Sequence, residues 1–373
     1  MVNCNRNEDF LYLTKEEKTM LSLRSLYKHT GYASFKMSQF EEYDLYVKNK
    51  EFLIGDSVLT FTDADGRLLA LKPDVTLSIV KNFNGDEKAL EKYCYNERVF
   101  RFSKEKHGFT ELMQSGVECL GAVDLTTTAE VIMLAADSLA KIGSPFLLEL
   151  SHISVIKSIV SDITDSEETQ RKIFHAIGEK NLHELKLLCD GHAFFDTLED
   201  ILSLRGEPGE VLRQLRLMDL PSTAMQGVQE LTDVSTILSN LGIPGIVLDF
   251  SLVSDVRYYN GILFRGYVGG VPERVLSGGR YDSLMQRMGK NGGAIGFAVY
   301  LNTLEHFERA EEAEHDIDIF LLYGENDDPH LVSQKLYDLR NQGHSICAGK
   351  KLPSSLSFKK VIDPTGKEVA SRG

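Results

Sequence analysis

The segment from Glu111 to Gly121 holds the side chains best suited to bind a small polar ligand. If it is a β-strand, its side chains alternate between faces, and Gln114, Gly116 and Glu118 share one side. Because glycine has no side chain, the pattern predicts a notch with an amide at one end and a carboxylate at the other. A carboxylate accepts charge-assisted hydrogen bonds, so the notch suits a ligand with cationic or N–H groups. The alternative is a solvent-facing strand with a glycine bulge.

Five other residues have both a functional and a structural interpretation. Asp74 and Thr76 stand at the first turn of a predicted helix, where they could bind a ligand or cap the helix. Arg101 ends an apolar strand, so its charged end could contact a ligand or reach solvent at the sheet edge. Tyr258 and Tyr259 could form a binding pair or alternate between core and surface. These residues alone predict an α/β protein with a candidate polar pocket.

No pattern indicates a metal, disulfide or cofactor site. The five cysteines form no C-x-x-C, and the ten histidines form no H-x-H or H-E-x-x-H. We therefore expect no structural zinc, no disulfide framework and no cofactor. The segment Ser277–Asp282 lacks the G-x-x-x-x-G-K spacing of a phosphate loop and is predicted to be a turn that opens a short helix.

The predicted elements place the candidate residues on a sheet with helices around it. Strands are predicted at 93–102, 111–120, 145–153, 245–253 and 258–268, and a hairpin at 57–71, around Asp-Gly. Helices are predicted at 14–27, from 72 onward and at 124–140, and residues 292–298 are expected to lead into a further helix. From about 154 to 240 strand signals vanish and helical periodicity dominates, which predicts an inserted helical region.

The C-terminal part is predicted to be a separate small unit. An acidic helix end and linker at 305–315 precede a strand at 317–322, a helix at 329–341 and a strand at 344–348. This order predicts the start of a β-α-β unit. The last twenty residues are polar and support no assignment.

Length, composition and charge exclude several classes of protein. A chain of 373 residues suggests two or three domains, and 42% hydrophobic with 26% charged residues excludes global disorder. No apolar run approaches the roughly 18 residues that span a bilayer, and the first residues do not resemble a secretory signal. A net charge of −14 disfavours binding of nucleic acid by the overall field. We expect a cytoplasmic protein without membrane contact.

Taken together and in order, six segments resemble the catalytic core of class II aminoacyl-tRNA synthetases, and the histidyl enzyme in particular. They are 71–76 (family pattern L-R-P-E-x-T), 100–101 (F-R-x-E of motif 2), 114–121 (Q-x-G-x-E-x-x-G), 252–260 (L-V-R-G-L-D-Y-Y-N), 277–282 (G-G-R-Y-D) and 293–304 (motif 3). The resemblance covers roughly residues 10 to 310, apart from the helical insertion.

The resemblance implies an α+β fold: a class II synthetase-like antiparallel sheet with flanking helices, a helical insertion and a small C-terminal α/β segment. It implies a core at 1–153 and 243–312, an insertion at 154–242, and a truncated anticodon-binding-like segment at 316–373. Because that segment is short, we expect no tRNA binding. The family pairs through its motif 1 region, here about 31–46, which implies a homodimer.

Four departures from the family pattern bear on function. Ser103 and Thr303 replace a glutamate of motif 2 and an arginine of motif 3, and Ser254 and Arg257 replace the arginine and aspartate of R-G-L-D-Y-Y. Adenylate formation needs cationic clamps on the triphosphate, and serine or threonine cannot replace arginine's planar donors. The resemblance therefore implies that ATP binding is lost while the amino-acid contacts remain.

Retained histidine recognition without ATP clamps resembles the regulatory subunits of ATP phosphoribosyltransferase, which carry no catalytic activity. This resemblance implies L-histidine as effector and a short-form ATP phosphoribosyltransferase catalytic subunit as partner, in the first step of histidine biosynthesis. The implied histidine-binding residues are Asp74, Thr76, Arg101, Gln114, Glu118, Tyr258 and Tyr259. The alternative is a divergent active histidyl-tRNA synthetase, and histidine-dependent ATP–pyrophosphate exchange would distinguish the two.

Overall fold

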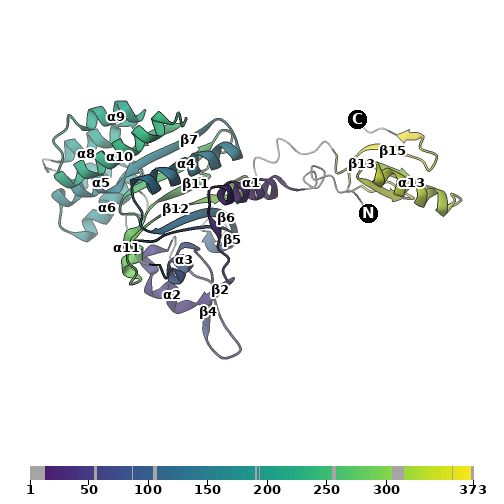
Figure 1. Cartoon of the computed structure of the whole chain (residues 1–373), viewed down its shortest axis with the longest axis horizontal. Coiled ribbons are helices and arrows are strands. Elements are labelled where there is room, and N and C mark those ends of the chain that lie inside the picture. Colours follow the sequence, from purple (N-terminus) through teal and green to yellow (C-terminus); the bar gives the residue numbers. More distant parts are fainter. Residues whose placement is uncertain are drawn as a thin grey trace. The chain divides into compact units, whose positions relative to one another are not determined.

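The computed structural model describes residues 13–53, 57–85, 87–103, 107–189, 191–192, 194–253, 258–304, 315–354 and 356–370. The chain divides into two compact units, one made by residues 19–304 and the other including the C-terminal residues from 305 onward. Figure 1 shows both, and each is described by itself. No helix among the described residues is long and apolar enough to cross a membrane.

The larger unit is built on a nine-stranded sheet of order β1-β5-β6-β12-β11-β10-β7-β9-β8. From β5 to β7 every neighbouring pair is antiparallel, whereas β1 pairs with β5 and β9 with β7 in parallel. In sheet order the strands are β1 (Ala33–Ser34), β5 (Leu90–Ser103), β6 (Gly108–Gly121), β12 (Gly293–Tyr300), β11 (Leu276–Arg280), β10 (Ile262–Val268), β7 (Phe146–His152), β9 (Ile246–Asp249) and β8 (Arg205–Gly206).

Helix α4 (Leu125–Ile142) packs on one face of this sheet, against β7, β10 and β12. The predicted start of this helix is confirmed, since the Asp124 carboxylate accepts the backbone N–H of Thr127 at 2.8 Å. The helix runs to Ile142, two residues beyond the predicted end at 140, and Gly143 is the C-cap. Helix α1 (Lys15–His29) adds Tyr27, whose ring meets Phe297 edge to face at 6.0 Å. These contacts form the hydrophobic core on this face.

The candidate site faces the opposite side of the sheet. There α3 (Thr76–Asn82) and α11 (Asp282–Arg287) lie with a small sheet and its helices, below the main sheet in Figure 1. The small sheet has the order β2 (Phe40–Glu42), β4 (Leu68–Leu71), β3 (Thr60–Thr62), and α2 (Tyr43–Lys48) and η1 (Lys50–Phe52) follow β2 in the chain. One buried cluster, which includes Leu77, Phe83 and Tyr95, joins α3 to β5. This packing fixes the first turn of α3 against the sheet.

Among the described residues, six helices occupy the region where an insertion was predicted: α5 (Ile153–Ile163), α6 (Glu167–Gly178), α7 (Leu182–Leu188), α8 (Phe195–Ser203), α9 (Pro208–Leu215) and α10 (Ser222–Asn240). They gather beside β7 in Figure 1. Helix α10 contacts α4, α5, α9, β7 and β10 and so joins the helices to the main sheet. The two-residue strand β8 within this region was not predicted.

The C-terminal unit has a four-stranded sheet of order β14 (Ile346–Gly349), β13 (Ile317–Leu322), β15 (Phe358–Ile362), β16 (Glu368–Ala370). Helix α13 (Pro329–Asn341) packs Val332 and Leu339 against Ile319 and Leu321 of β13. The predicted β-α-β start is confirmed, whereas β15 and β16 were not predicted. Of the predicted linker, residues 305–314 lie outside the described residues.

One predicted turn is wrong. Residues 276–280 form the inner strand β11, and only Tyr281 and Asp282 lead into α11. The two glycines serve close packing: a Cβ on Gly278 would lie 2.4 Å from the Gly296 carbonyl oxygen, and one on Gly279 2.7 Å from the Tyr259 ring. Likewise, residues 293–300 are the strand β12, followed by the short helix η2 (Leu301–Leu304).

Candidate functional site

A polar cavity lies between the start of α3 and the facing strands β5, β6, β11 and β12. Its volume is about 390 Å³ including its open mouth. The structure places every one of the seven residues singled out from the sequence on its wall: Asp74, Thr76, Arg101, Gln114, Glu118, Tyr258 and Tyr259. Segments separated by nearly two hundred residues thus converge on one space.

Gly116 does not leave an open notch, contrary to the simplest expectation. It pairs across the ladder with Tyr95 of β5, and a Cβ on Gly116 would lie 2.5 Å from the Tyr95 hydroxyl and 2.4 Å from the Phe297 carbonyl oxygen. The missing side chain therefore makes room for the tyrosine, and Tyr95 forms part of the cavity wall. Gln114 and Glu118 remain on the same face, two residues to either side, and each is 2% exposed.

Glu118 is the most constrained group in the cavity. The Thr76 hydroxyl donates to its Oε1 at 2.7 Å, and the Tyr281 hydroxyl donates to its Oε2 at 2.5 Å. Burial raises the pKa of Glu118 to about 8, and the nearby Asp74 adds to the rise, while the two hydroxyl donors oppose it. The Glu118 carboxyl group is therefore mostly protonated at neutral pH.

Asp74 combines the two roles that the sequence left as alternatives. Its Oδ1 accepts the backbone N–H of Leu77 at 2.9 Å and so caps α3, while the residue also lines the cavity. Arg101 donates from Nε to the Pro73 carbonyl oxygen at 2.9 Å and brings Nη2 within 3.8 Å of Asp74 Oδ2. Burial raises the pKa of Asp74, and the Arg101 charge opposes that rise.

Three tyrosine rings close one side. Tyr258 stands 4.8 Å from Tyr259 and 5.5 Å from Tyr281 between ring centroids. Sequence reasoning missed Tyr281, because the segment around it was predicted to be a turn; its place directly after a glycine-rich strand was the available signal.

Two carboxyl groups, one guanidinium, an amide and several phenolic hydroxyls therefore surround a space fit for a small molecule. Of the described residues on the wall, Arg101 is the one cation. Such a set suits a ligand that bears both an ammonium or N–H group and a carboxylate. In the described part of the chain, no group of three or more His, Cys, Asp or Glu residues is arranged to hold a metal ion.

The departures from the synthetase pattern lie away from this wall or beyond the described residues. Thr303 is buried in η2, where its hydroxyl donates to the Tyr300 carbonyl oxygen at 2.7 Å, and it does not line the cavity. Ser103 ends β5 and also does not line it. Ser254 and Arg257 lie outside the described residues.

A second, larger hollow of about 1380 Å³ including its open mouth lies among α9, α10 and the start of β9. Its charged wall residues, Glu207, Arg213 and Arg216, are all exposed to solvent. The smaller cavity instead combines buried carboxyls with raised pKa values, which is the usual mark of a functional site. We therefore take the smaller cavity as the candidate site.

Comparison with known proteins identifies a family for most of this unit. The model of the histidyl-tRNA synthetase family matches residues 12–304. Among curated proteins, the chain is 29% identical over 306 residues to the ATP phosphoribosyltransferase regulatory subunit of Clostridium kluyveri, covering 78% of each chain. It is 28% identical over 373 residues to the protein of the same name from Ruminiclostridium cellulolyticum, covering 96% of this chain and 86% of the relative.

Solved structures share the fold. A Bacillus halodurans protein described as an ATP phosphoribosyltransferase regulatory subunit/histidyl-tRNA synthetase superposes with a TM-score of 0.75 at 21% identity, covering 94% of this chain and 93% of that one. Histidyl-tRNA synthetase from Nostoc gives 0.69 at 18% identity, covering 91% and 83%. A chain of the ATP phosphoribosyl transferase (HisG:HisZ) complex from Thermotoga maritima gives 0.60 at 21% identity, covering 77% and 97%. The α+β class II synthetase-like fold expected from the sequence is confirmed.

Proposed function

This chain belongs to the histidyl-tRNA synthetase family, and within that family we propose a non-catalytic role for it. It is a histidine-sensing regulatory subunit of ATP phosphoribosyltransferase, the enzyme of the first step of histidine biosynthesis. The curated relatives that match most of the chain carry the name of that regulatory subunit. The observation that carries the proposal is the cavity itself, where all seven residues implied by the family pattern converge.

L-Histidine matches the groups on the cavity wall. Glu118 and Tyr259 receive the imidazole N–H groups, and Asp74, Thr76 and Gln114 hold the α-amino group. The Thr76 hydroxyl already donates to Glu118, so its oxygen lone pairs are free to accept from an ammonium. Arg101 supplies the positive charge that the α-carboxylate requires.

The same wall is poorly equipped to activate histidine. Thr303 stands where the family has an ATP-binding arginine, and its hydroxyl is bonded to its own helix. Arg101 is then the one cation available from the described wall residues, which is too little charge to clamp a triphosphate. Binding without adenylation is what a sensor requires.

A sensor acts only through another protein, and the partner is the short-form ATP phosphoribosyltransferase catalytic subunit. One solved structure with this fold is named as part of such a complex. A homodimer of this chain is the building block, and tRNA plays no part.

The test is co-expression with the short catalytic chain from the same genome, followed by size-exclusion chromatography and a phosphoribosyltransferase rate assay. We expect a stable hetero-oligomer that histidine inhibits, while the catalytic chain alone is insensitive. Glu118→Gln should assemble normally but lose inhibition, because an N–H of the ligand then faces an amide in place of a carboxylate.

Glu111→Gln is the matched control. Glu111 lies on the same strand, β6, but it is exposed, pairs with Arg98 at 2.9 Å and does not line the cavity. It should behave as the wild type. If no complex forms, or if the Glu118→Gln complex is inhibited at the same histidine concentration, the proposal is wrong.

A further inference from the structure

Two consecutive residues at the end of β11 project to opposite faces of the main sheet. Tyr281 reaches the cavity and donates to Glu118 at 2.5 Å. Arg280 turns toward the helices on the other face, where its Nη1 lies 3.9 Å from Oε1 of Glu230 on α10. The backbone between these two side chains therefore connects the cavity wall to the longest helix of the insertion.

On the helical face, Glu230 is held from two sides. Its Oε2 lies 3.0 Å from Nε2 of His152, a buried residue at the end of β7. The backbone N–H of Ser154 donates to His152 Nδ1, so that nitrogen carries the lone pair and Nε2 carries the hydrogen that Glu230 accepts. Arg280 supplies the second contact, so α10 is joined to both β7 and β11 through a single carboxylate.

Glycines make room for this network. A Cβ on Gly261 would lie 3.0 Å from Cδ of Arg280, and one on Gly293 would lie 3.2 Å from its Nη2. On α10, a Cβ on Gly227 would lie 2.6 Å from Nδ1 of His152. The side chains therefore have little space to adopt other positions, and a shift at one end must be taken up along the network.

On the cavity side of the sheet, hydrogen bonds tie the segment around Asn260 to Arg280 and Asp282. The backbone N–H of Asn260 donates to the Arg280 carbonyl oxygen, and the Asp282 N–H donates to the Asn260 side-chain oxygen, both at 2.9 Å. Asp282 in turn accepts from Arg280 Nε at 2.8 Å. Asn260 directly follows Tyr259, so the segment that brings Tyr259 to the cavity is tied to both neighbours of Tyr281.

We propose that Arg280 and Glu230 are positioning residues that couple ligand binding in the cavity to helix α10. This inference rests on the proposed function, because it takes L-histidine as the ligand. Histidine must share Glu118 with the Tyr281 hydroxyl, and any adjustment of Tyr281 moves the backbone that carries Arg280. Such coupling is reciprocal. Loss of the Arg280–Glu230 contact therefore changes the affinity of the cavity for histidine, although Glu230 does not line that cavity.

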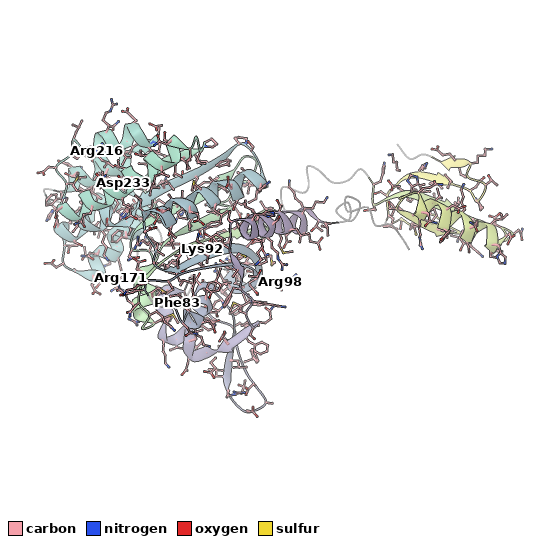
Figure 2. The ribbon with its side chains drawn as sticks, in the orientation of Figure 1. Phe83, Lys92, Arg98, Arg171, Arg216 and Asp233 are labelled. Carbon is pink, nitrogen blue, oxygen red and sulfur yellow. The ribbon has the colours of Figure 1, made fainter. Side chains whose placement is uncertain are left out.

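The experiment compares Glu230→Gln with Asp233→Asn in the full-length chain. Asp233 lies on the same helix, as labelled in Figure 2, and its Oδ1 accepts a hydrogen bond at 2.8 Å from Nε2 of Gln229 on that helix. Both variants remove one negative charge from α10. Histidine affinity is measured by calorimetry, and amide hydrogen exchange of residues 222–240 is measured with and without saturating histidine.

We expect histidine to change exchange in α10 of the wild type and of Asp233→Asn. In Glu230→Gln the histidine-dependent change in α10 exchange should disappear. The affinity for histidine should change at least about fivefold, which is the lower end of typical coupling between sites. Tyr281→Phe should have a similar effect, and the double variant with Glu230→Gln should lose less affinity than the product of the two single losses. A purely structural role of Glu230 would alter exchange without histidine but would leave the histidine-dependent change intact.

The outcomes separate this inference from the proposed function. If the wild type binds histidine but α10 exchange does not respond, or if Glu230→Gln responds like Asp233→Asn, the coupling is refuted and the sensor proposal stands. If the wild type does not bind histidine, the proposed function fails and this inference fails with it.

Discussion

Gly116 and Tyr95 face each other on adjacent strands, and the tyrosine hydroxyl occupies the space that a side chain at position 116 would need. The ring thereby becomes part of the cavity wall, with Gln114 and Glu118 of β6 to either side. The cavity therefore has this shape only because Gly116 has no side chain.

Gly116→Ala should therefore damage the cavity. The new methyl group meets the Tyr95 hydroxyl at 2.5 Å and the rigid Phe297 carbonyl oxygen at 2.4 Å, so the ring or the strand must move. We expect a loss of about 1–3 kcal/mol in the free energy of unfolding, as for other overpacked cores, and at least tenfold weaker histidine binding. Urea unfolding and calorimetry measure the two effects. Gly178→Ala, where a Cβ meets nothing within 4 Å, is the control.

Histidine binding should release a proton from Glu118. The pKa of this carboxyl is raised to about 8, whereas a carboxylate partner for an ammonium or N–H group must be ionised. At pH 7 we expect close to one proton released per histidine bound. The buffer takes up the released proton, and this uptake gives off more heat in a buffer of high ionisation enthalpy. The observed binding enthalpy should then be more negative in such a buffer, for example Tris, than in phosphate. Glu118→Gln should abolish this buffer dependence, and a dependence that persists in the variant would contradict the assignment.

The same raised pKa predicts how stability depends on pH without ligand. Between the ordinary pKa of 4.5 and the folded value of about 8, the folded protein binds more protons at Glu118 than the unfolded chain. Stability from this group is therefore full below pH 4.5 and falls as pH rises toward 8. Asp74, whose pKa is also raised, acts in the same direction. Glu118→Gln should flatten the fall in melting temperature between pH 6 and pH 8.5, and an unchanged slope would show that the group is ionised when empty.

Much of the site could be predicted because its residues carry local signals. Asp74 and Thr76 stand at the start of a helix, and Gln114 and Glu118 share one face of a strand, so family resemblance and periodicity agreed on them. Tyr95 carried no such signal, and Tyr281 lay in a segment that resembled the family pattern but was predicted to be a turn. Tyr95 enters the cavity because of its cross-strand register with Gly116, and Tyr281 because β11 is an inner strand. Both facts depend on pairing between segments far apart in the sequence.

The secondary structure, like the site, was predictable only where the signal is local in the sequence. The cap at Asp124 and the stop at Gly143 could be read locally, since each rests on a single backbone contact. Residues 277–280 could not, because glycine is common both in turns and where strands and rings pack closely, and only the positions of Gly296 and Tyr259 decide between them.

The chain should not catalyse histidine-dependent ATP–pyrophosphate exchange. Losing one preorganised clamp typically lowers a rate about 10²–10³-fold, and Thr303 is bonded to its own helix in place of a clamp. Radiolabelled pyrophosphate exchange should stay at background with saturating histidine and ATP, with an active histidyl-tRNA synthetase as the positive control. Exchange at synthetase-like rates would instead support the alternative of a divergent synthetase.

The chain should form a homodimer through the region of residues 31–46. Of the aromatic residues there, Tyr32 and Tyr46 are each 1% exposed and belong to the core, Phe35 and Tyr43 are partly buried, and Phe40 is 47% exposed. Phe40 meets Phe61 edge to face at 5.6 Å, so the small sheet carries exposed apolar rings, a common feature of interfaces.

Light scattering at micromolar concentration should give twice the 41.8 kDa chain mass. Phe40→Glu should shift the mass toward the monomer, because a charge at the centre of an apolar interface loses its hydration without gaining a partner. Leu217→Glu is the control, since Leu217 is 85% exposed on the helical insertion and should leave the mass unchanged. A wild-type mass of one chain would refute the dimer, and a Phe40→Glu dimer as stable as the wild type would place the interface elsewhere.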